Sequence, residues 1–445
     1  MHVAIVGAGL AGLSAALELR ALDHEVTVLE ARDRVGGRTL TETHMGVAVD
    51  GGGQYVGPEQ HNVLAWARRY GLEVWPAYAE GDWLLELSGS VRSQHGEWPA
   101  LAPAADAELR AAVDALDAMC AQVPVDAPWA APSAAAWDAM TAREWVIENV
   151  ADPDARTFLR LCMEVTLAAE WYEASLLHML FMFHSLGGGF ASAIWRAQDL
   201  RIIGGTHALS LAAAGELGDR VILDAPVTAI TSRGEHLEVH VDGRAAVIAD
   251  RAVVALPPPL AARLRYDPPL PGRRDQLCQR MPLGAALKAV SFYDRPFWRE
   301  RGHNGLVLSD RGPAGWVYDN CWPDADPAML VAFVTGRAAL DLSAMRPGER
   351  REALLAGIAR ALGSEAARPL DYVEWSWADE HWSRGCYATY APPGAWTALG
   401  SALRAPIGRI HWAGSDTAGD WSGFMDGAIA SGRRVATEIA AAGRR

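Results

Sequence analysis

The chain has 445 residues, half of them hydrophobic, which is enough to bury a large core in two or three domain-sized units. Asp and Glu outnumber Lys and Arg by 54 to 40, and the net charge of -14 makes a nucleic-acid partner unexpected. The five cysteines are widely spaced, so neither a disulfide framework nor a metal site is expected. No signal-like or membrane-spanning segment is recognisable, and we expect a cytoplasmic protein without a membrane partner.

The amino-terminal segment has the pattern of a βαβ unit. Residues 2–6 are an apolar strand-type run, residues 10–22 carry small and apolar side chains at helical spacing, and residues 25–29 alternate like a second strand. A GxGxxG motif at residues 7–12 lies between the first strand and the helix. Together these features predict a dinucleotide-binding site.

Each polar or glycine position of this unit has its own expected task. Gly7 permits the tight turn, Gly9 lets the backbone approach a pyrophosphate, and Gly12 lets the helix pack closely on the strand. Glu30 follows the second strand, at the distance where an acidic side chain binds the adenosine ribose. The helix amino terminus is expected to face the phosphates.

The following residues separate FAD from NAD. Residues 31–39 resemble the extended motif of the glutathione reductase and amine oxidase flavoproteins, and they include Arg32 and Arg38. Arg38 follows two glycines, where its guanidinium would offset the diphosphate charge. We therefore expect FAD as the cofactor.

Four further segments, in the same order along the chain, resemble the flavin-containing monoamine oxidase family. They are residues 50–58, 282–299, 383–394 and 412–428, so the resemblance is effectively full length. Two departures are Phe424, where the family often has tyrosine, and Asp416, where glutamate is common. The resemblance implies further FAD-binding residues at Gly52, Gly53, Val227, Trp377, Cys386, Gly414, Asp416 and Met425.

Cys386 and Lys288 have specific roles in this resemblance. Cys386 matches the cysteine that carries the flavin in the mammalian enzymes, although some relatives hold FAD noncovalently and a free cysteine is often only a small buried hydrophobe. Lys288 matches the flavin-facing lysine that reaches N5 through water and assists reaction with oxygen. A lysine among apolar neighbours is costly unless it has a partner, which favours this role over a solvent-facing one.

The resemblance places Tyr387 and Phe424 as an aromatic cage around the amine. Such a cage would favour the neutral amine, because desolvation lowers the pKa of an ammonium group. Both rings could instead be ordinary core aromatics, and for Trp377 a core role is as plausible as packing against the flavin. We take Lys288, Tyr387 and Phe424 as the candidate catalytic residues.

The predicted fold class is α/β, with a Rossmann-type FAD-binding domain interleaved with an α+β substrate domain. Residues 1–79, 204–280 and 380–440 are assigned to the FAD domain. Residues 80–203, expected to be helical, and 281–379, expected to form sheet, are assigned to the substrate domain.

The candidate substrate pocket is hydrophobic. Gln198 resembles the pocket glutamine of the family, and Trp316 is near its aromatic gate. Trp195, Leu167, Phe181, Phe183 and Ile194 are expected to add apolar walls. A carboxylate-bearing substrate would need Arg196 or Arg201, and a polyamine would need Glu164, Glu170 or Asp199 to point inward.

These features predict an oxidase that converts a small hydrophobic primary amine to an imine and then an aldehyde, with O2 reduced to hydrogen peroxide. The alternatives on the same fold are an amino acid or polyamine oxidase and a desaturase or dehydrogenase. An alternative of another class is a flavin-binding interaction protein without turnover. The expected partners are the amine and O2, with no metal, and a homodimer is left open.

Overall fold

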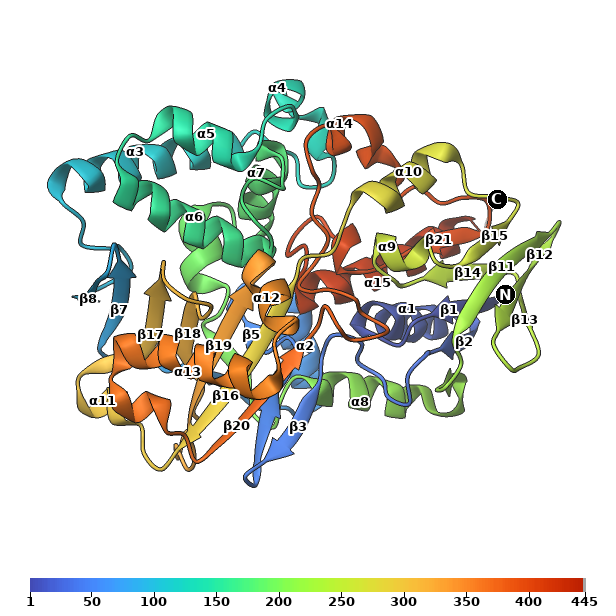
Figure 1. Ribbon diagram of the computed structural model, residues 1–445. Coiled ribbons are helices and arrows are strands. Elements are labelled where there is room, and N and C mark those ends of the chain that lie inside the picture. Colours follow the sequence, from blue (N-terminus) through green and yellow to red (C-terminus); the bar gives the residue numbers. More distant parts are fainter. Residues whose placement is uncertain (443–445) are drawn as a thin grey trace.

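The computed structural model describes residues 1–442, and a five-stranded parallel sheet forms the centre of one half of the molecule (Figure 1). All neighbouring strands of this sheet are parallel. Its central strands are almost fully buried, as expected for a sheet covered on both faces. In spatial order the strands are β10 (Val221–Ile222), β2 (Glu25–Leu29), β1 (His2–Val6), β14 (Arg251–Val254) and β21 (Ile410–Trp412).

The two faces of this sheet have different covers. Val3 and Ile5 of β1 pack with helices, whereas Ala4 and Val6 pack toward a second sheet, because successive side chains of a strand point to opposite faces. The helices are α1 (Leu10–Ala21), α2 (His61–Arg69), α8 (His207–Leu217) and α15 (Met425–Ala442). The second sheet has the order β13 (Val247–Ala249), β12 (His236–Val241), β11 (Val227–Arg233) and β15 (Arg265–Asp267).

A seven-stranded mixed sheet forms the other half of the molecule. Its one parallel pair joins β17 to β7, and the other neighbouring strands are antiparallel. In spatial order the strands are β20 (Asp371–Ser376), β16 (Ala286–Tyr293), β19 (Ala328–Thr335), β18 (Trp316–Asp319), β17 (His303–Ser309), β7 (Asp82–Leu87) and β8 (Ser90–Gln94). Three helices pack with it, α11 (Phe297–Glu300), α12 (Gly336–Ser343) and α13 (Pro347–Leu362).

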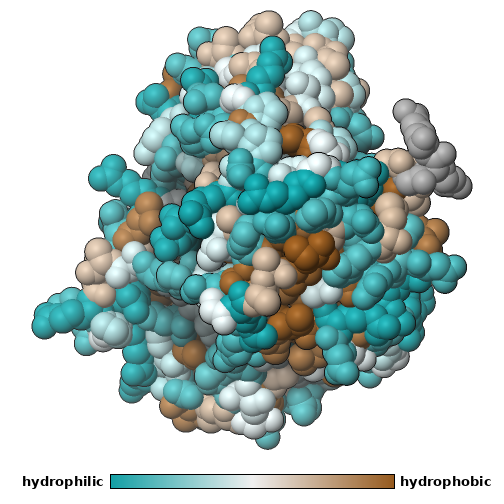
Figure 2. All heavy atoms as spheres, turned by 90° about the vertical axis from the view of Figure 1, so that its right-hand side faces the viewer, coloured by the Kyte–Doolittle hydropathy of each residue, from teal (hydrophilic) through white to brown (hydrophobic). Residues whose placement is uncertain are grey.

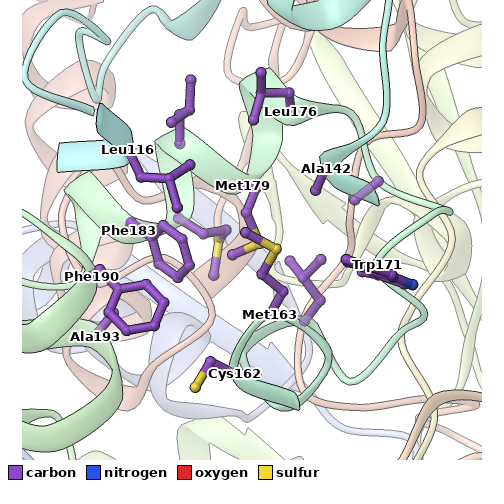
Figure 3. Packing of buried hydrophobic residues seen from close by; sticks show 14 of the residues in the cluster. Leu116, Ala142, Cys162, Met163, Trp171, Leu176, Met179, Phe183, Phe190 and Ala193 are labelled. Atoms are coloured by element: carbon purple, nitrogen blue, oxygen red, sulfur yellow. The ribbon is translucent and has the colours of Figure 1, made fainter. Parts of the chain in front are cut away.

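A group of helices adjoins this sheet and contains the largest hydrophobic cluster. Thr141, Asp152 and Ser175 each cap the start of one of these helices with a side-chain hydrogen bond. Figure 3 shows Leu116, Met163, Met179 and Phe183 gathered in the core between them. The helices are α3 (Pro103–Cys120), α4 (Ala134–Asp138), α5 (Ala142–Asn149), α6 (Pro153–Leu167) and α7 (Leu176–Ser185).

Shorter elements connect these parts. Small sheets pair β3 (Thr41–His44) with β4 (Val47–Asp50), and β5 (Tyr55–Val56) and β6 (Val74–Pro76) with β9 (Leu200–Ile202). The short helices are α9 (Pro258–Ala261), α10 (Gly272–Arg280), α14 (Ala395–Leu399), a π-helix at Ser192–Arg196, and 3-10 turns at Pro128–Ala130, Gly218–Arg220, Ser364–Ala367, Gly400–Ala402 and Ser415–Thr417.

The predicted fold class, an interleaved Rossmann-type α/β fold, is confirmed. The segments assigned to the FAD domain supply the five-stranded and four-stranded sheets, and those assigned to the substrate domain supply the seven-stranded sheet. The block 80–203 is not purely helical, because β7 pairs with β17 of the later block. β9 pairs with β5 and β6 across a predicted boundary, and the boundaries themselves stay a prediction.

Within the described residues, no helix is both long and apolar enough to cross a membrane. On the face shown in Figure 2, hydrophilic residues surround a small group of hydrophobic ones.

Candidate active site

A cavity runs from the edge of the five-stranded sheet to the seven-stranded sheet. It encloses about 1850 Å³ of space not filled by atoms, counted to its solvent-open mouth. Gly7 and Glu30 line one end, and Gln198 and Trp316 line the other. The lining therefore joins the glycine loop of the dinucleotide motif to the residues expected around a substrate.

The three glycines of the first loop are required for three different reasons. Gly7 has a φ of +101°, which favours glycine. A Cβ on Gly12 would lie 2.0 Å from the Gly7 carbonyl oxygen, so only glycine lets α1 pack this closely. A Cβ on Gly9 would meet no protein atom within 4 Å, and this open space at the start of α1 is where a pyrophosphate would approach.

Glu30 fixes the loop as well as facing the cavity. The side chain is buried, and one carboxylate oxygen accepts a hydrogen bond from the Ala8 N–H at 2.7 Å. The other oxygen accepts from the Arg32 N–H at 3.1 Å and from its guanidinium at 3.3 Å. Arg32 also donates to Glu380 at 2.5 Å and to Ser383 at 2.8 Å, which ties the segment before Cys386 to the nucleotide end.

Arg38 joins the glycine-rich segment to the two carboxy-terminal motifs. Its guanidinium donates to the Tyr387 carbonyl oxygen, to Ser415 Oγ at 3.3 Å and to Asp416 Oδ2 at 3.4 Å. Asp416 is buried and accepts the Thr389 N–H at 2.6 Å through its other oxygen. Asp416, which is shorter than the glutamate common in the family, therefore joins Arg38 to the segment 383–394. It also lies beside Gly414 and Ser415, which line the cavity.

The glycines at residues 51–53 allow several segments to meet. A Cβ on Gly51 would lie 2.6 Å from the Trp375 ring, and one on Gly52 would lie 2.1 Å from the Arg38 carbonyl oxygen. Trp377 donates its indole N–H to the Gly51 carbonyl at 2.9 Å, and it lines the cavity. Gly53 and Met425, the first residue of α15, also line it.

Lys288 lies in β16, whose eight residues are all buried, and its Nζ reaches the cavity. It donates to the Gly52 carbonyl oxygen at 3.0 Å and to Gln54 Oε1. Burial lowers the pKa of Lys288 to about 7; Asp50 opposes this shift, and Arg201 adds to it. Lys288 is therefore poised to hold or release a proton near neutral pH.

The Cys386 thiol is buried against the cavity, and Gly284 fixes its backbone. The Cys386 N–H donates to the Gly284 carbonyl at 2.9 Å, and a Cβ on Gly284 would lie 2.8 Å from the Cys386 carbonyl oxygen. Burial raises the pKa of Cys386 to about 11, although Arg38 and Lys288 both act to lower it. The thiol is thus mainly protonated at neutral pH in the protein alone.

Tyr387 and Phe424 both line the cavity. Tyr387 packs edge-on against Phe333 with ring centroids 6.4 Å apart, and Phe424 packs against Trp421 at 5.7 Å. Burial raises the pKa of Tyr387 above its ordinary value, so the phenol stays neutral. The two rings thus come from different chain segments and both form part of the cavity wall. Their role as a cage around the amine stays a prediction.

The apolar wall differs in part from the expected one. Trp316, Ile194 and Gln198 line the cavity. Trp195 lies behind Trp316, with ring centroids 6.4 Å apart, and is not a lining residue. The predicted wall residues Leu167, Phe181 and Phe183 are instead buried in the helical core (Figure 3 shows Phe183), because the apolar faces of their helices pack against neighbouring helices.

The charged side chains considered for the pocket lie elsewhere. Arg196 and Asp199 are exposed, Arg201 is buried over the Trp322 ring, and Glu164 pairs with Arg160 at 2.9 Å. Glu170 accepts the Arg337 N–H at 2.9 Å. Among the described lining residues, the charged ones are Glu30, Arg32, Arg38 and Lys288.

The comparisons with known proteins identify the family. The model of the flavin-containing amine oxidoreductases matches residues 10–440. The chain belongs to this family. It is 37% identical to a probable flavin-containing monoamine oxidase A of Dictyostelium discoideum, over 98% of this chain and 97% of the relative. It is 36% identical to flavin-containing amine oxidase B of Canis lupus familiaris, over 98% and 85% of the two chains.

Solved structures agree with this assignment. A putrescine oxidase bound to putrescine is similar with a TM-score of 0.96 and 36% identity, over 99% of both chains. A cyclohexylamine oxidase from Brevibacterium oxydans IH-35A is similar with a TM-score of 0.93 and 32% identity, over 100% of this chain and 99% of the other. The protein is an FAD-dependent amine oxidase, and the family resemblance and enzyme class predicted from the sequence are confirmed.

The cavity of this amine oxidase fits the flavin dinucleotide. The open space at Gly9 and the helix amino terminus suit a pyrophosphate, Glu30 suits a ribose, and Gly53, Trp377 and Cys386 line the part that reaches Lys288. Val227 begins β11 and its side chain packs beside the nucleotide sheet, outside the cavity lining. Its backbone contact with adenine stays a prediction. Within residues 1–442 no group of three or more His, Cys, Asp or Glu is placed to hold a metal.

Several pocket residues of the amine oxidase are absent from the sequence-based prediction. Phe333 pairs in register with both Lys288 and Trp316, so the three form one row across the sheet. The sequence shows the alternation of apolar residues within each strand. It does not show the order of the strands, which creates the row. The missed lining residues on the substrate side are Tyr55, Val165, Thr166, Met182, Leu186, Ala193, Tyr318 and Phe333.

Proposed function

We propose that this amine oxidase acts on small hydrophobic primary amines. The net reaction converts an amine R–CH2–NH2, O2 and water to an aldehyde, ammonia and hydrogen peroxide. The observation that carries the proposal is the substrate side of the cavity, where aromatic and aliphatic residues predominate and Gln198 and Thr166 add uncharged polar groups. Each methylene buried there contributes about 0.8 kcal/mol, which favours an apolar tail.

The reaction divides between the cofactor and the residues of the chain. When bound, FAD supplies the acceptor for the two electrons of the α C–H bond and passes them to O2. Tyr387 and Phe424 exclude water from the amine and favour its neutral form. Gln198 orients the substrate without a charge, and Lys288 holds a proton at Nζ beside the glycine-rich segment.

A diamine is the second candidate, because one similar structure is a putrescine oxidase bound to putrescine. The second ammonium group of a diamine needs an acidic or strongly polar partner. The acidic residue that lines this cavity is Glu30, which accepts a hydrogen bond from Ala8 at the nucleotide end. A monoamine therefore fits the lining better.

The substrate is tested by comparing kcat/KM for hexylamine, phenethylamine, putrescine and phenylalanine with a peroxide readout. We expect the two monoamines to exceed putrescine and phenylalanine by tenfold or more, a difference of about 1.4 kcal/mol. Higher efficiency with putrescine or phenylalanine overturns the monoamine assignment. Flavin reduction by amines without peroxide formation in air would instead indicate a dehydrogenase.

We also propose that FAD is attached covalently through the Cys386 sulfur, as an 8α-thioether. The S–H bond and one C–H bond of the flavin 8α-methyl group would be broken as the C–S bond forms, and the two electrons released would go by way of the flavin to O2. The position of the thiol on the cavity, with its backbone fixed by Gly284, supports this proposal. Because burial raises the pKa of the thiol to about 11, attachment is expected to be slow at neutral pH and faster at alkaline pH.

Acid precipitation tests the attachment. We expect a yellow pellet from the wild-type enzyme and free FAD in the supernatant of Cys386→Ala. Cys162→Ala is the matched control, because Cys162 is buried in the helical core away from the cavity lining. A colourless wild-type pellet rules out covalent FAD, and a yellow Cys386→Ala pellet assigns the bond to another residue.

A further inference from the structure

Lys288 is the only lysine of the chain. The 40 Lys and Arg residues comprise this one lysine and 39 arginines. Its side chain is 3% exposed, and its Nζ bonds to two acceptors, the Gly52 carbonyl oxygen and Gln54 Oε1. A neutral amine has two N–H donors and one lone pair, so these two acceptors leave one nitrogen valence for the cavity.

Gln54 is itself held by a second buried amide. Its Nε2 donates to Asn320 Oδ1 at 2.9 Å, and both side chains are buried. This bond turns the Gln54 oxygen toward Lys288. Without it, the Gln54 amide could rotate and present a donor to the lysine nitrogen.

The backbone of Asn320 is held by two hydrogen bonds. It follows β18, its N–H donates to the Met329 carbonyl at 2.8 Å, and its carbonyl accepts the Arg201 guanidinium at 2.8 Å. Arg201 is buried and stacks over the Trp322 ring at 4.0 Å. A chain of polar groups thus runs from the buried Arg201 through Asn320 and Gln54 to Lys288.

We propose that Gln54 and Asn320 are positioning residues for Lys288. They hold its nitrogen so that the one position not bonded to Gly52 or Gln54 faces the cavity. In the neutral form this position carries the lone pair, and in the charged form it carries the third N–H. Lys288 then exchanges one proton with the cavity in one fixed direction, and no redox step is involved. The inference deepens the proposed function and rests on it for the identity of the reacting groups.

The charged and titratable groups around Lys288 come from several elements. Asp50 of β4 raises its pKa, Arg201 of β9 lowers it, and Cys386 raises it. Tyr55 of β5 and Tyr387 also line this part of the cavity. Variants at Gln54 and Asn320 leave all of these groups in place, so a change in Lys288 titration reports on the amide pair.

The single lysine makes a direct measurement available. Protein labelled with [ε-13C]lysine gives one lysine resonance, whose shift is followed against pH in the FAD-loaded enzyme. We expect a wild-type midpoint below the ordinary lysine value of 10.5, because Lys288 is buried. Gln54→Leu removes an acceptor that favours the charged form and is expected to lower the midpoint by about 1 pH unit. Asn320→Leu is expected to shift the midpoint in the same direction by less.

Two further variants keep the test decisive. Gln54→Glu places a carboxylate beside Lys288 and is expected to raise the midpoint by about 1–3 pH units. This variant tests the proposal even if Gln54→Leu fails to fold. Gln60→Leu is the matched control, a buried amide that donates to the Ala197 carbonyl at 3.5 Å. It is expected to leave the midpoint at the wild-type value.

The outcomes separate the two proposals. If Gln54→Leu or Gln54→Glu titrates like the wild type, the positioning role is wrong even when amine turnover is intact. If the midpoint moves as expected but no amine yields peroxide, the proposed function fails while the positioning of Lys288 stands. An altered pH profile of flavin reoxidation, shifted in the same direction as the resonance, supports both.

Discussion

Lys288 shows how one residue combines burial with chemistry. All eight residues of β16 are buried, and a charged lysine in such a strand is costly. The protein reduces this cost by lowering the pKa of Lys288 to about 7 and by supplying two hydrogen-bond acceptors. Burial keeps a neutral amine available beside the cofactor site, whereas the two acceptors favour the charged form.

Lys288→Met is expected to slow flavin reoxidation by O2 more than flavin reduction by amine. Methionine keeps much of the apolar volume but removes the nitrogen that holds a proton at the cavity. Stopped-flow measurement of the two half-reactions, with the same amine at the same flavin load, checks this expectation. An unchanged reoxidation rate would remove Lys288 from the oxygen reaction.

The same variant is expected to change how stability depends on pH. Burial lowers the pKa of Lys288 from its ordinary 10.5 to about 7 in the folded protein. Between these pH values the unfolded chain binds more protons, so the free energy of unfolding rises with pH by up to about 1.4 kcal/mol per pH unit from this group.

Lys288→Met should lose that contribution. Denaturant unfolding of both proteins at pH 7, 8, 9 and 10 gives the two curves, and the difference between them isolates Lys288 from other titrating groups. We expect the stability advantage of the methionine variant to be largest at pH 7 and to shrink toward pH 10. Parallel curves would contradict a lowered pKa.

At the scale of elements, the loop between β1 and α1 contains one glycine that packing requires, Gly12, and one that we expect cofactor binding to require, Gly9. A Cβ on Gly12 would strike the Gly7 carbonyl oxygen at 2.0 Å, so α1 would have to move away from the nucleotide sheet. A Cβ on Gly9 would meet no protein atom within 4 Å. Two glycines of one motif are therefore required for different reasons.

Gly12→Ala and Gly9→Ala form a matched pair. We expect Gly12→Ala to lower the free energy of unfolding by roughly 2–4 kcal/mol, as for overpacking against rigid backbone. Gly9→Ala should keep the stability of the FAD-free protein within about 1 kcal/mol but bind FAD at least tenfold more weakly. Thermal unfolding of the FAD-free proteins and FAD titration check the pair, and equal loss of stability in both would contradict it.

At the scale of the whole molecule, the distribution of amines is unusual. Because Lys288 is the only lysine and is buried, no lysine side chain faces solvent. The aldehyde formed by the proposed reaction therefore meets no surface lysine with which to form a Schiff base.

Labelling with a bulky N-hydroxysuccinimide ester is expected to leave Lys288 unmodified in the native protein and to label it after denaturation. Arg346→Lys is the positive control, because the Arg346 side chain is 84% exposed, and the introduced lysine should be labelled in the native state. Mass spectrometry of the intact protein and of its peptides reads the result. A label on Lys288 in the native protein would show that its site opens to large reagents.

The sequence by itself determined the parts whose physics is local. The first strand, the glycine turn, the helix and Glu30 follow one another within 30 residues, so their periodicity and spacing predict the nucleotide site directly. Lys288 and Cys386 could also be found, because each lies in a short motif that resembles those of the family. Their cavity positions agree with that interpretation.

Only the tertiary structure decided which apolar side chains form the pocket. Phe183 and Ile194 are both apolar and both precede Gln198, yet Phe183 packs in the helical core and Ile194 lines the cavity. Phe333 reaches the same cavity because strand pairing places it between Lys288 and Trp316. The Gln54–Asn320 bond joins residues 266 positions apart. Hydrophobicity and periodicity select buried residues, but the face each one meets depends on long-range packing, which no local pattern specifies.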